Sequence, residues 1–242
     1  MIPKTIHYCW FGGNPLPKDA EKCINSWKKY CPDYEIIEWN ESNFNINSNQ
    51  YVKEAYEAKK FAFVTDFVRL YVMYTYGGIY MDTDVEVVRS LDDFLKHQAF
   101  SGFESSNSIP TGIMGSEKDF PLFKKLLDYY DDKHFIKKDG SLDTTTNTVT
   151  ITNICKECGL VLNNRFQVLD GFALYPNDYF CPLENETGVL RKTENTAAIH
   201  WFAKSWVEEK HRSMMAFTRV LHRIFGTEFI HNLAVKLGLR KQ

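Results

Sequence analysis

The chain has 242 residues, a formal net charge of -2 and 44% hydrophobic residues, 15% of the chain being aromatic. This composition excludes a disordered chain and a bundle of membrane helices, and the length predicts one domain with at most an appendage. Nucleic acid is not expected as a partner, because binding it requires many clustered Lys and Arg residues.

The N-terminal stretch MIPKTIHYCWFGG lacks the charged and long apolar regions of a signal peptide. No apolar run approaches the roughly 20 residues of a membrane span. We therefore expect a cytoplasmic protein, in which the six cysteines are thiols rather than disulfides.

A strand, a helix and a second strand are predicted at the start of the chain. Residues 6–10 read as a buried strand that a glycine turn at 12–13 closes, and residues 34–40 read as another strand. Between them, Cys23, Ile24 and Trp27 fall on one side of a helix. This βαβ unit predicts an α/β fold whose ligands bind at the carboxyl ends of parallel strands.

One long helix is predicted over residues 51–76, and its second half is apolar on nearly all sides, as in a buried helix. Asp66 and Arg69 lie three residues apart on one face of this helix. Two buried charges are costly unless they pair with each other or bind a ligand, and both interpretations are open. Gly77 or Gly78 ends the helix, and a strand follows at once.

The later elements are predicted more coarsely. We expect a short helix near 90–95, a strand at 99–104, a helix at 120–132 and a polar loop entering a β-prone segment at 141–153. A strand and turn at 171–182 and a strand followed by a loop at 195–206 complete the domain. The predicted organisation is a catalytic domain over 1–206 and a basic helical tail over 207–242.

Two aspartates follow the strand that begins at Gly78, in the stretch GGIYMDTDVEV. If the strand continues through them, Tyr80, Asp82 and Asp84 point to one face, so the two carboxylates converge. Two such groups repel each other without a cation, which indicates Mg²⁺ or Mn²⁺ and, through the metal, phosphate chemistry.

Three other interpretations of the stretch DTDVEV depend on its neighbouring residues. An EF-hand calcium loop requires glycine at its sixth position, where this chain has Val87. A haloacid-dehalogenase-like phosphatase also uses DxDxV, which Val85 satisfies, and it stays as the alternative. A solvated turn at a strand end is the structural alternative.

Three stretches together resemble glycosyltransferase family 32, the sugar transferases with a DxD motif. They are IPKTIHYCWFGG, FVTDFVRLYVMYTYGGIYMDTDV and NTAAIHWFAKSW. The resemblance spans residues 2 to about 206 and implies a GT-A fold, which is a Rossmann-like nucleotide-sugar-binding fold. The family includes initiating mannosyltransferases and bacterial capsule enzymes, and it is distantly similar to large glucosylating toxins.

The resemblance also implies roles for residues of the first two stretches. Trp10 matches the tryptophan that stacks on the nucleotide base. Asp66 and Arg69 match the pair that holds the donor sugar's hydroxyls and steadies the diphosphate. Tyr80 and Asp82 match the positions that touch ribose and metal.

Further roles concern the metal and the closing of the donor site. Asp84 matches the direct metal ligand, and His200, Ser205 and Trp206 match a C-terminal cluster for metal and phosphate. The toxins have a carboxylate where His200 falls, which leaves its direct coordination open. Asn147 and Asn153 are the candidates for the position beside the anomeric carbon.

The predicted function is a retaining, metal-dependent transfer of a hexose from a nucleotide sugar to a glycan or lipid-linked glycan of a capsule or cell surface. A UDP-sugar is the first choice of donor, followed by GDP-mannose. Front-side attack and double displacement are both open. A non-catalytic nucleotide-binding protein is the second alternative.

The tail over 207–242 carries an apolar stripe at three- and four-residue steps, interrupted near Gly226. The stripe consists of Met215, Val220, Leu221, Ile224, Phe225, Phe229, Ile230, Leu233 and Leu237, and the basic residues Arg212, Arg219, Arg223, Lys236, Arg240 and Lys241 lie mostly off it. Such a helix is typical of peripheral binding to an anionic membrane, here the inner face of the cell membrane. Packing on the catalytic domain and a dimer contact are the alternatives.

Overall fold

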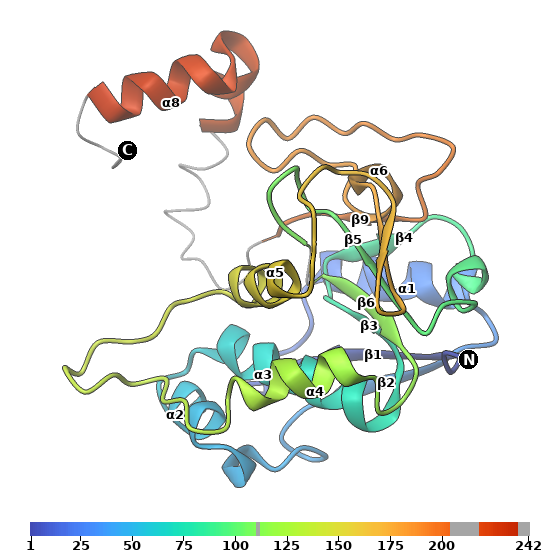
Figure 1. The fold of residues 1–242 in the computed structure, drawn as a ribbon, viewed down its shortest axis with the longest axis vertical. Helices are drawn as coiled ribbons and strands as arrows, with labels where there is room; N and C mark the ends of the chain where they lie inside the picture. Colours follow the sequence, from blue (N-terminus) through green and yellow to red (C-terminus); the bar gives the residue numbers. More distant parts are fainter. Residues whose placement is uncertain (110–111, 204–217, 237–242) are drawn as a thin grey trace.

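A mixed seven-stranded sheet forms the centre of the computed structural model, which describes residues 1–109, 112–203 and 218–236 (Figure 1). Its strand order is β2-β1-β3-β6-β5-β8-β7, and a separate two-stranded sheet pairs β4 with β9. The strands are β1 (Thr5–Cys9), β2 (Glu35–Trp39), β3 (Gly78–Met81), β4 (Val85–Val87), β5 (Ala99–Gly102), β6 (Ile113–Ser116), β7 (Gln167–Leu169), β8 (Phe172–Tyr175) and β9 (Ala198–His200). The predicted α/β class is confirmed.

The strands are connected by α-helices and by short 3-10 helices. The α-helices are α1 (Lys18–Tyr30), α2 (Gln50–Glu57), α3 (Phe61–Tyr76), α4 (Pro121–Asp128), α5 (Asn147–Glu157), α6 (Asn177–Phe180) and α8 (Thr227–Lys236). Two 3-10 helices, η1 (Ile46–Ser48) and η2 (Asp92–Phe94), lie in loops, and residues 218–225 are also helical.

The predicted βαβ unit at the start of the chain is confirmed. Strand β1 pairs in parallel with both β2 and β3, and α1 buries Cys23, Ile24 and Trp27 against the sheet. The Trp27 indole donates a hydrogen bond to the Val85 carbonyl at 2.7 Å. This contact ties α1 to the strand that follows the two aspartates.

Alternation along β3 separates the two apolar layers of the core. Tyr80 packs in the layer under α2, α3, α4 and α5, whereas Ile79 and Met81 pack in the layer under α1 and α6. Helices therefore cover both faces of the sheet (Figure 1).

The prediction of one helix over 51–76 is wrong, because the chain breaks into α2 and α3. Lys59 adopts a positive φ of 56°, and the Lys60 amide donates to the Ala55 carbonyl at 2.8 Å, which closes α2. No glycine or proline marks this corner in the sequence. The break gives α3 its own direction across the sheet, with Val64, Val68 and Val72 fully buried.

The β-prone segment predicted near residue 150 is instead the helix α5. Its Thr, Val and Ile residues are β-branched, which favours strands, but Ile151 and Cys155 are spaced for a helix and pack into the core. Two strands, β6 and β7, were not predicted. Because β6 is antiparallel to both neighbours, the sheet is not a purely parallel one.

Candidate active site

The site lies at the carboxyl ends of the parallel strands β1 and β3. Trp10 follows β1 and Asp82 follows β3, and the Asp82 amide donates to the Gly112 carbonyl at 2.8 Å. The prediction that one strand continues through both aspartates is wrong. The strand ends at Met81, and residues 82–85 form a turn in which the Val85 amide donates to the Asp82 carbonyl at 3.0 Å.

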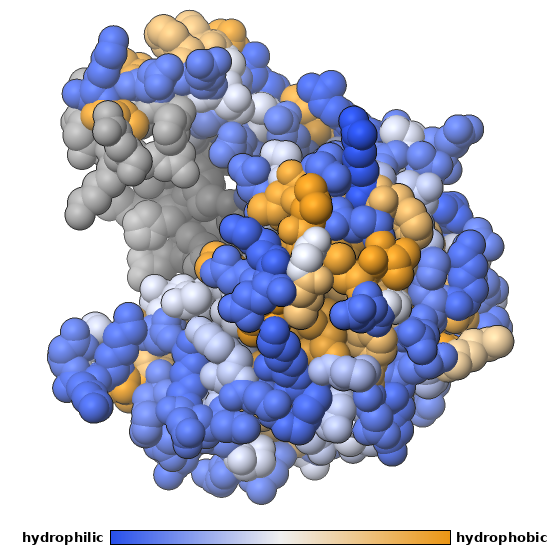
Figure 2. All heavy atoms as spheres, viewed as in Figure 1, coloured by the Kyte–Doolittle hydropathy of each residue, from blue (hydrophilic) through white to orange (hydrophobic). Residues whose placement is uncertain are grey.

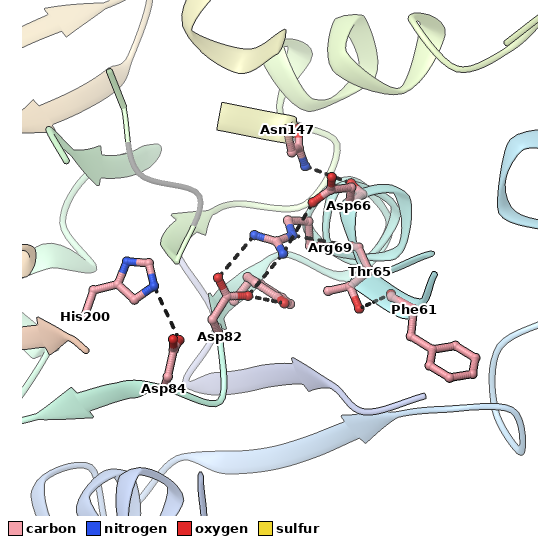
Figure 3. A network of polar contacts seen from close by, with 9 residues as sticks. Phe61, Thr65, Asp66, Arg69, Asp82, Asp84, Asn147 and His200 are labelled. Atoms are coloured by element: carbon pink, nitrogen blue, oxygen red, sulfur yellow. Dashed lines mark hydrogen bonds and ion pairs between the residues drawn. The ribbon is translucent and has the colours of Figure 1, made fainter. Parts of the chain in front are cut away.

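Arg69 is the centre of a buried polar network between α3 and this turn (Figure 3). Its Nη2 lies 3.1 Å from Asp82 Oδ1 and 3.5 Å from Asp66 Oδ1. Its Nε donates to the Thr65 carbonyl at 3.3 Å, and its guanidinium lies 4.8 Å from the centroid of the Tyr80 ring. The predicted pair of Asp66 and Arg69 exists, but Asp82 shares the guanidinium.

The Asp66 carboxyl titrates near neutral pH. Burial raises its pKa to about 7, because the Arg69 charge only partly offsets the loss of solvation and the Asp82 charge adds to it. A carboxyl with such a pKa can either donate or accept a hydrogen bond near neutral pH. This property suits a group that faces sugar hydroxyls.

Tyr80 lies beneath the site rather than at its surface. The residue is 1% exposed, and its hydroxyl donates to Asp82 Oδ1 at 2.8 Å. Burial, reinforced by the Asp82 charge, raises the pKa of the Tyr80 hydroxyl well above its ordinary value, so the group stays a donor. In this structure Tyr80 orients Asp82, and a contact with ribose stays a prediction.

Asp84 is paired with a residue from the far end of the sequence. Strand β9 runs antiparallel to β4 and sets His200 opposite Val85, so that His200 Nε2 lies 3.4 Å from Asp84 Oδ1. The Ala203 amide donates to Asp84 Oδ2 at 2.8 Å. Burial opposes the charge on both partners, yet their attraction holds the pKa of Asp84 below and that of His200 well above the ordinary value.

Each aspartate of the motif therefore has its own cationic neighbour, Arg69 for Asp82 and His200 for Asp84. The repulsion expected between two bare carboxylates is relieved by the protein itself. Repulsion between the two carboxylates therefore does not by itself require a metal.

Three side chains of the site could serve as ligands of a metal ion. Asp82, Asp84 and His200 each offer one ligand atom, and these three atoms lie within 4.8 Å of one another. Carboxylate oxygens suit Mg²⁺ and Mn²⁺, and an imidazole favours the transition metal. His200 Nδ1 is buried without a hydrogen-bond partner among the described residues. These residues fit a divalent cation.

Trp10 lies at the mouth of β1, half-buried, and its indole donates to the Asn14 carbonyl at 2.6 Å. The glycine turn beside it has a packing reason, since a Cβ on Gly12 would lie 2.4 Å from the Phe61 ring. A half-exposed indole at this edge suits the predicted stacking on a base, which stays a prediction. Ser205 and Trp206 lie outside the described residues.

Asn147 is the one of the two candidate asparagines that reaches the site. It begins α5, is 2% exposed, and its Nδ2 donates to the Asp66 carbonyl at 2.9 Å. Its Oδ1 has no hydrogen-bond partner among the described residues. Asn153 is exposed on the same helix. Two residues of the sequence indicate the bounds of α5: Thr146 is a residue type common before a helix, and Gly159 is one common after it.

Residues 17–101 match the family model described as "Glycosyltransferase sugar-binding region containing DXD motif". That range holds Asp66, Arg69, Asp82 and Asp84. This match agrees with the predicted resemblance to the glycosyltransferases of family 32. The parallel strands β2, β1 and β3, with the DxD turn after β3, agree with the Rossmann-like part of the predicted GT-A fold. The phosphatase alternative is not favoured.

The chain is similar to proteins of eukaryotes and of a virus. Inositol phosphoceramide mannosyltransferase 3 of Schizosaccharomyces pombe is 31% identical over 134 residues, which is 52% of this chain and 36% of that protein. The uncharacterized glycosyltransferase L373 of Acanthamoeba polyphaga mimivirus is 27% identical over 75% of this chain and 78% of its own length. The chain thus spans about a third of the yeast relative.

Among solved structures, the PaToxG glycosyltransferase aligns with a TM-score of 0.49 and 18% identity, over 64% of this chain and 69% of that chain.

Proposed function

We propose that this chain is a metal-dependent retaining hexosyltransferase that uses a nucleotide sugar. The observation that carries the proposal is the cluster of Asp82, Asp84 and His200 beside the buried Arg69, within a DXD sugar-binding region. In this cluster, the carboxylates of Asp82 and Asp84, which could bind a cation, lie next to the fixed Arg69 guanidinium, which could bind a phosphate.

The residues divide the work of binding and leaving-group stabilisation. Asp82, Asp84 and His200 would hold Mn²⁺ or Mg²⁺, which neutralises charge that develops on a departing diphosphate. Arg69 adds a permanent positive charge at the same point, because Asp66 and Asp82 fix its guanidinium. Asp66 and the free Oδ1 of Asn147 face the donor sugar's hydroxyls in this proposal.

A UDP-hexose remains the first donor proposed, and the names of the yeast relatives make GDP-mannose a specific second one. The acceptor proposed is a glycan, free or lipid-linked, in capsular or cell-surface polysaccharide synthesis on the cytoplasmic side of the membrane. The yeast relatives are named for a ceramide acceptor, which supports a lipid-borne acceptor here.

The test is release of nucleoside diphosphate from UDP-glucose, UDP-galactose, UDP-N-acetylglucosamine and GDP-mannose, with Mn²⁺, with Mg²⁺ and with excess chelator. We expect turnover of one donor, its loss in chelator and its loss in Asp84→Asn. Asp93→Asn is the matched control, because Asp93 is an exposed aspartate that pairs with Arg89 away from the cluster.

Three outcomes contradict parts of the proposal. Full activity in chelator, or in Asp84→Asn, removes the metal role. Tight nucleotide binding without turnover of any donor favours a non-catalytic binding protein. Hydrolysis of a simple phosphate monoester at a higher rate than any nucleotide sugar would restore the phosphatase.

A further inference from the structure

The helix formed by residues 218–225 is attached to the domain through its polar side. Arg219 Nε donates to the Asn185 carbonyl at 3.0 Å, and Arg223 Nε donates to the Thr187 carbonyl at 2.8 Å. Arg223 Nη2 also donates to the Gly188 carbonyl at 3.1 Å, and a Cβ on Gly188 would lie 3.0 Å from that same atom. The loop over 185–188 is therefore shaped to receive two arginines.

The arginines that the sequence assigned to lipid are thus engaged with the protein. Arg219, His222 and Arg223 share one face of a helix by their spacing, and His222 is buried. Val220 and Ile224 occupy the opposite side, where Ile224 is 66% exposed. The contacts hold the helix with its apolar side outward, which is the reverse of an ordinary surface helix.

The apolar side continues across the break into α8. Gly226, with a φ of 82°, separates the two helices, and the rings of Phe225 and Phe229 lie 6.0 Å apart across it. We call the resulting set the tail surface: Val220, Ile224, Phe225, Phe229 and Leu233, each exposed by 41% or more. These are five of the fourteen large hydrophobic side chains exposed in the described part of the chain. In Figure 2, hydrophobic residues are interspersed among hydrophilic ones at the end of the molecule that carries α8.

Charge indicates which partner fits this surface. Residues 207–242 contain seven Lys or Arg and three Glu, a net charge of +4, whereas the whole chain is at -2. The segment that carries the tail surface therefore has a net positive charge within a chain that is negative overall. Of the predicted stripe and basic residues, Met215, Leu237, Arg212, Arg240 and Lys241 lie outside the described residues.

We propose that the tail surface lies on an anionic lipid bilayer, with the apolar side chains among the acyl chains and the domain held above by Arg219 and Arg223. Apolar area combined with local positive charge is the combination that binds such surfaces. Within 1–109, 112–203 and 218–236, no helix combines the length and the hydrophobicity needed to cross a bilayer. The proposal therefore concerns binding at the interface and does not depend on the transferase reaction.

The test is flotation of the full chain with vesicles of phosphatidylcholine alone or with phosphatidylglycerol added. We expect binding that requires phosphatidylglycerol and falls with added salt. Ile224→Glu and Phe229→Glu should each lower vesicle affinity at least about tenfold, because each puts a charge where an apolar side chain would enter the membrane.

Two control variants test whether loss of vesicle binding is specific to the tail surface. Val161→Glu and Phe166→Glu alter side chains that are 58% and 52% exposed elsewhere in the domain, so they should float like the wild type. Thermal unfolding should be unchanged in all four variants, because none of the four side chains is buried.

Three results overturn the proposal. One is a wild-type chain that never floats with anionic vesicles. Another is a dimer in sedimentation that Ile224→Glu converts to a monomer, because the surface then pairs with a second copy. The third is marked destabilisation by Ile224→Glu or Phe229→Glu, which would mean that the surface packs inside the protein.

Discussion

Acidification should destabilise this protein through one buried histidine, His7. The residue is 1% exposed in β1, where its Nε2 lies 3.0 Å from the Gly77 carbonyl and its Nδ1 accepts a hydrogen bond from the Trp39 indole at 3.1 Å. These partners are satisfied by the neutral ring with its proton on Nε2. A second proton would have to sit on Nδ1, facing the N–H of Trp39.

The magnitude follows from the shift in pKa. Burial lowers the pKa of His7 from 6.5 to about 4, although the Gly77 carbonyl opposes the shift. Because the folded pKa is below the unfolded one, the unfolded chain binds more protons, and stability falls as pH drops from 6.5 to 4. The loss is about 2 kcal/mol at pH 5 and about 3 kcal/mol below pH 4.

The assay compares urea unfolding of the wild type and of His7→Gln at pH 7 and at pH 5, at constant ionic strength. Other titrating groups, including Asp66 and His200, are the same in both proteins, so their contributions cancel in the difference. The free energy of unfolding of the wild type, relative to the variant, should drop by about 2 kcal/mol between the two pH values. A relative stability that is the same at pH 7 and pH 5 would refute the reasoning.

Three further predictions concern the site. Trp10→Ala should weaken binding of the nucleoside diphosphate by about 1 to 3 kcal/mol in calorimetry, and unchanged affinity with a large loss of stability would make Trp10 a core residue. Tyr80→Phe should lower metal affinity and kcat several-fold without unfolding the chain, since it removes the hydroxyl that holds Asp82; identical metal titrations would contradict this role. Arg69→Met should lower the free energy of unfolding by about 3 to 5 kcal/mol, because it leaves Asp66 and Asp82 buried without their cation. Chemical unfolding measures this, and a loss below about 1 kcal/mol would show that the network is not stabilising.

The sequence was most informative where its pattern is local and strong. The βαβ unit and the buried α3 follow from short-range periodicity. Asp82 and Asp84 do offer ligand atoms close to each other, but a turn brings them together and not the strand alternation that predicted it. The pairing of Asp84 with His200 does not follow from short-range periodicity, because it depends on the antiparallel pairing of Val85 with His200, 115 residues later in the chain. Only the resemblance to a family brought His200 into the predicted site.

Two local failures have physical causes as well. Strand β6 contains a glycine where a β-branched residue would be expected, but a Cβ on Gly115 would lie 2.2 Å from the Phe100 ring. That requirement arises from packing between neighbouring strands, which a single sequence does not display. In α5, tertiary burial of Ile151 and Cys155 outweighs the strand preference of the β-branched residues around them.

Because β4 pairs with β9, the proposed metal site is completed later in synthesis than the main sheet. All seven strands of the main sheet are contained in residues 5–175, so a growing chain can complete that sheet before His200 has been made. His200, the third residue of the proposed metal site, arrives only with β9, the last strand in the described part of the chain. A chain truncated before residue 198 would therefore contain every strand of the main sheet, together with Arg69 and both aspartates, yet lack the histidine of the proposed metal site.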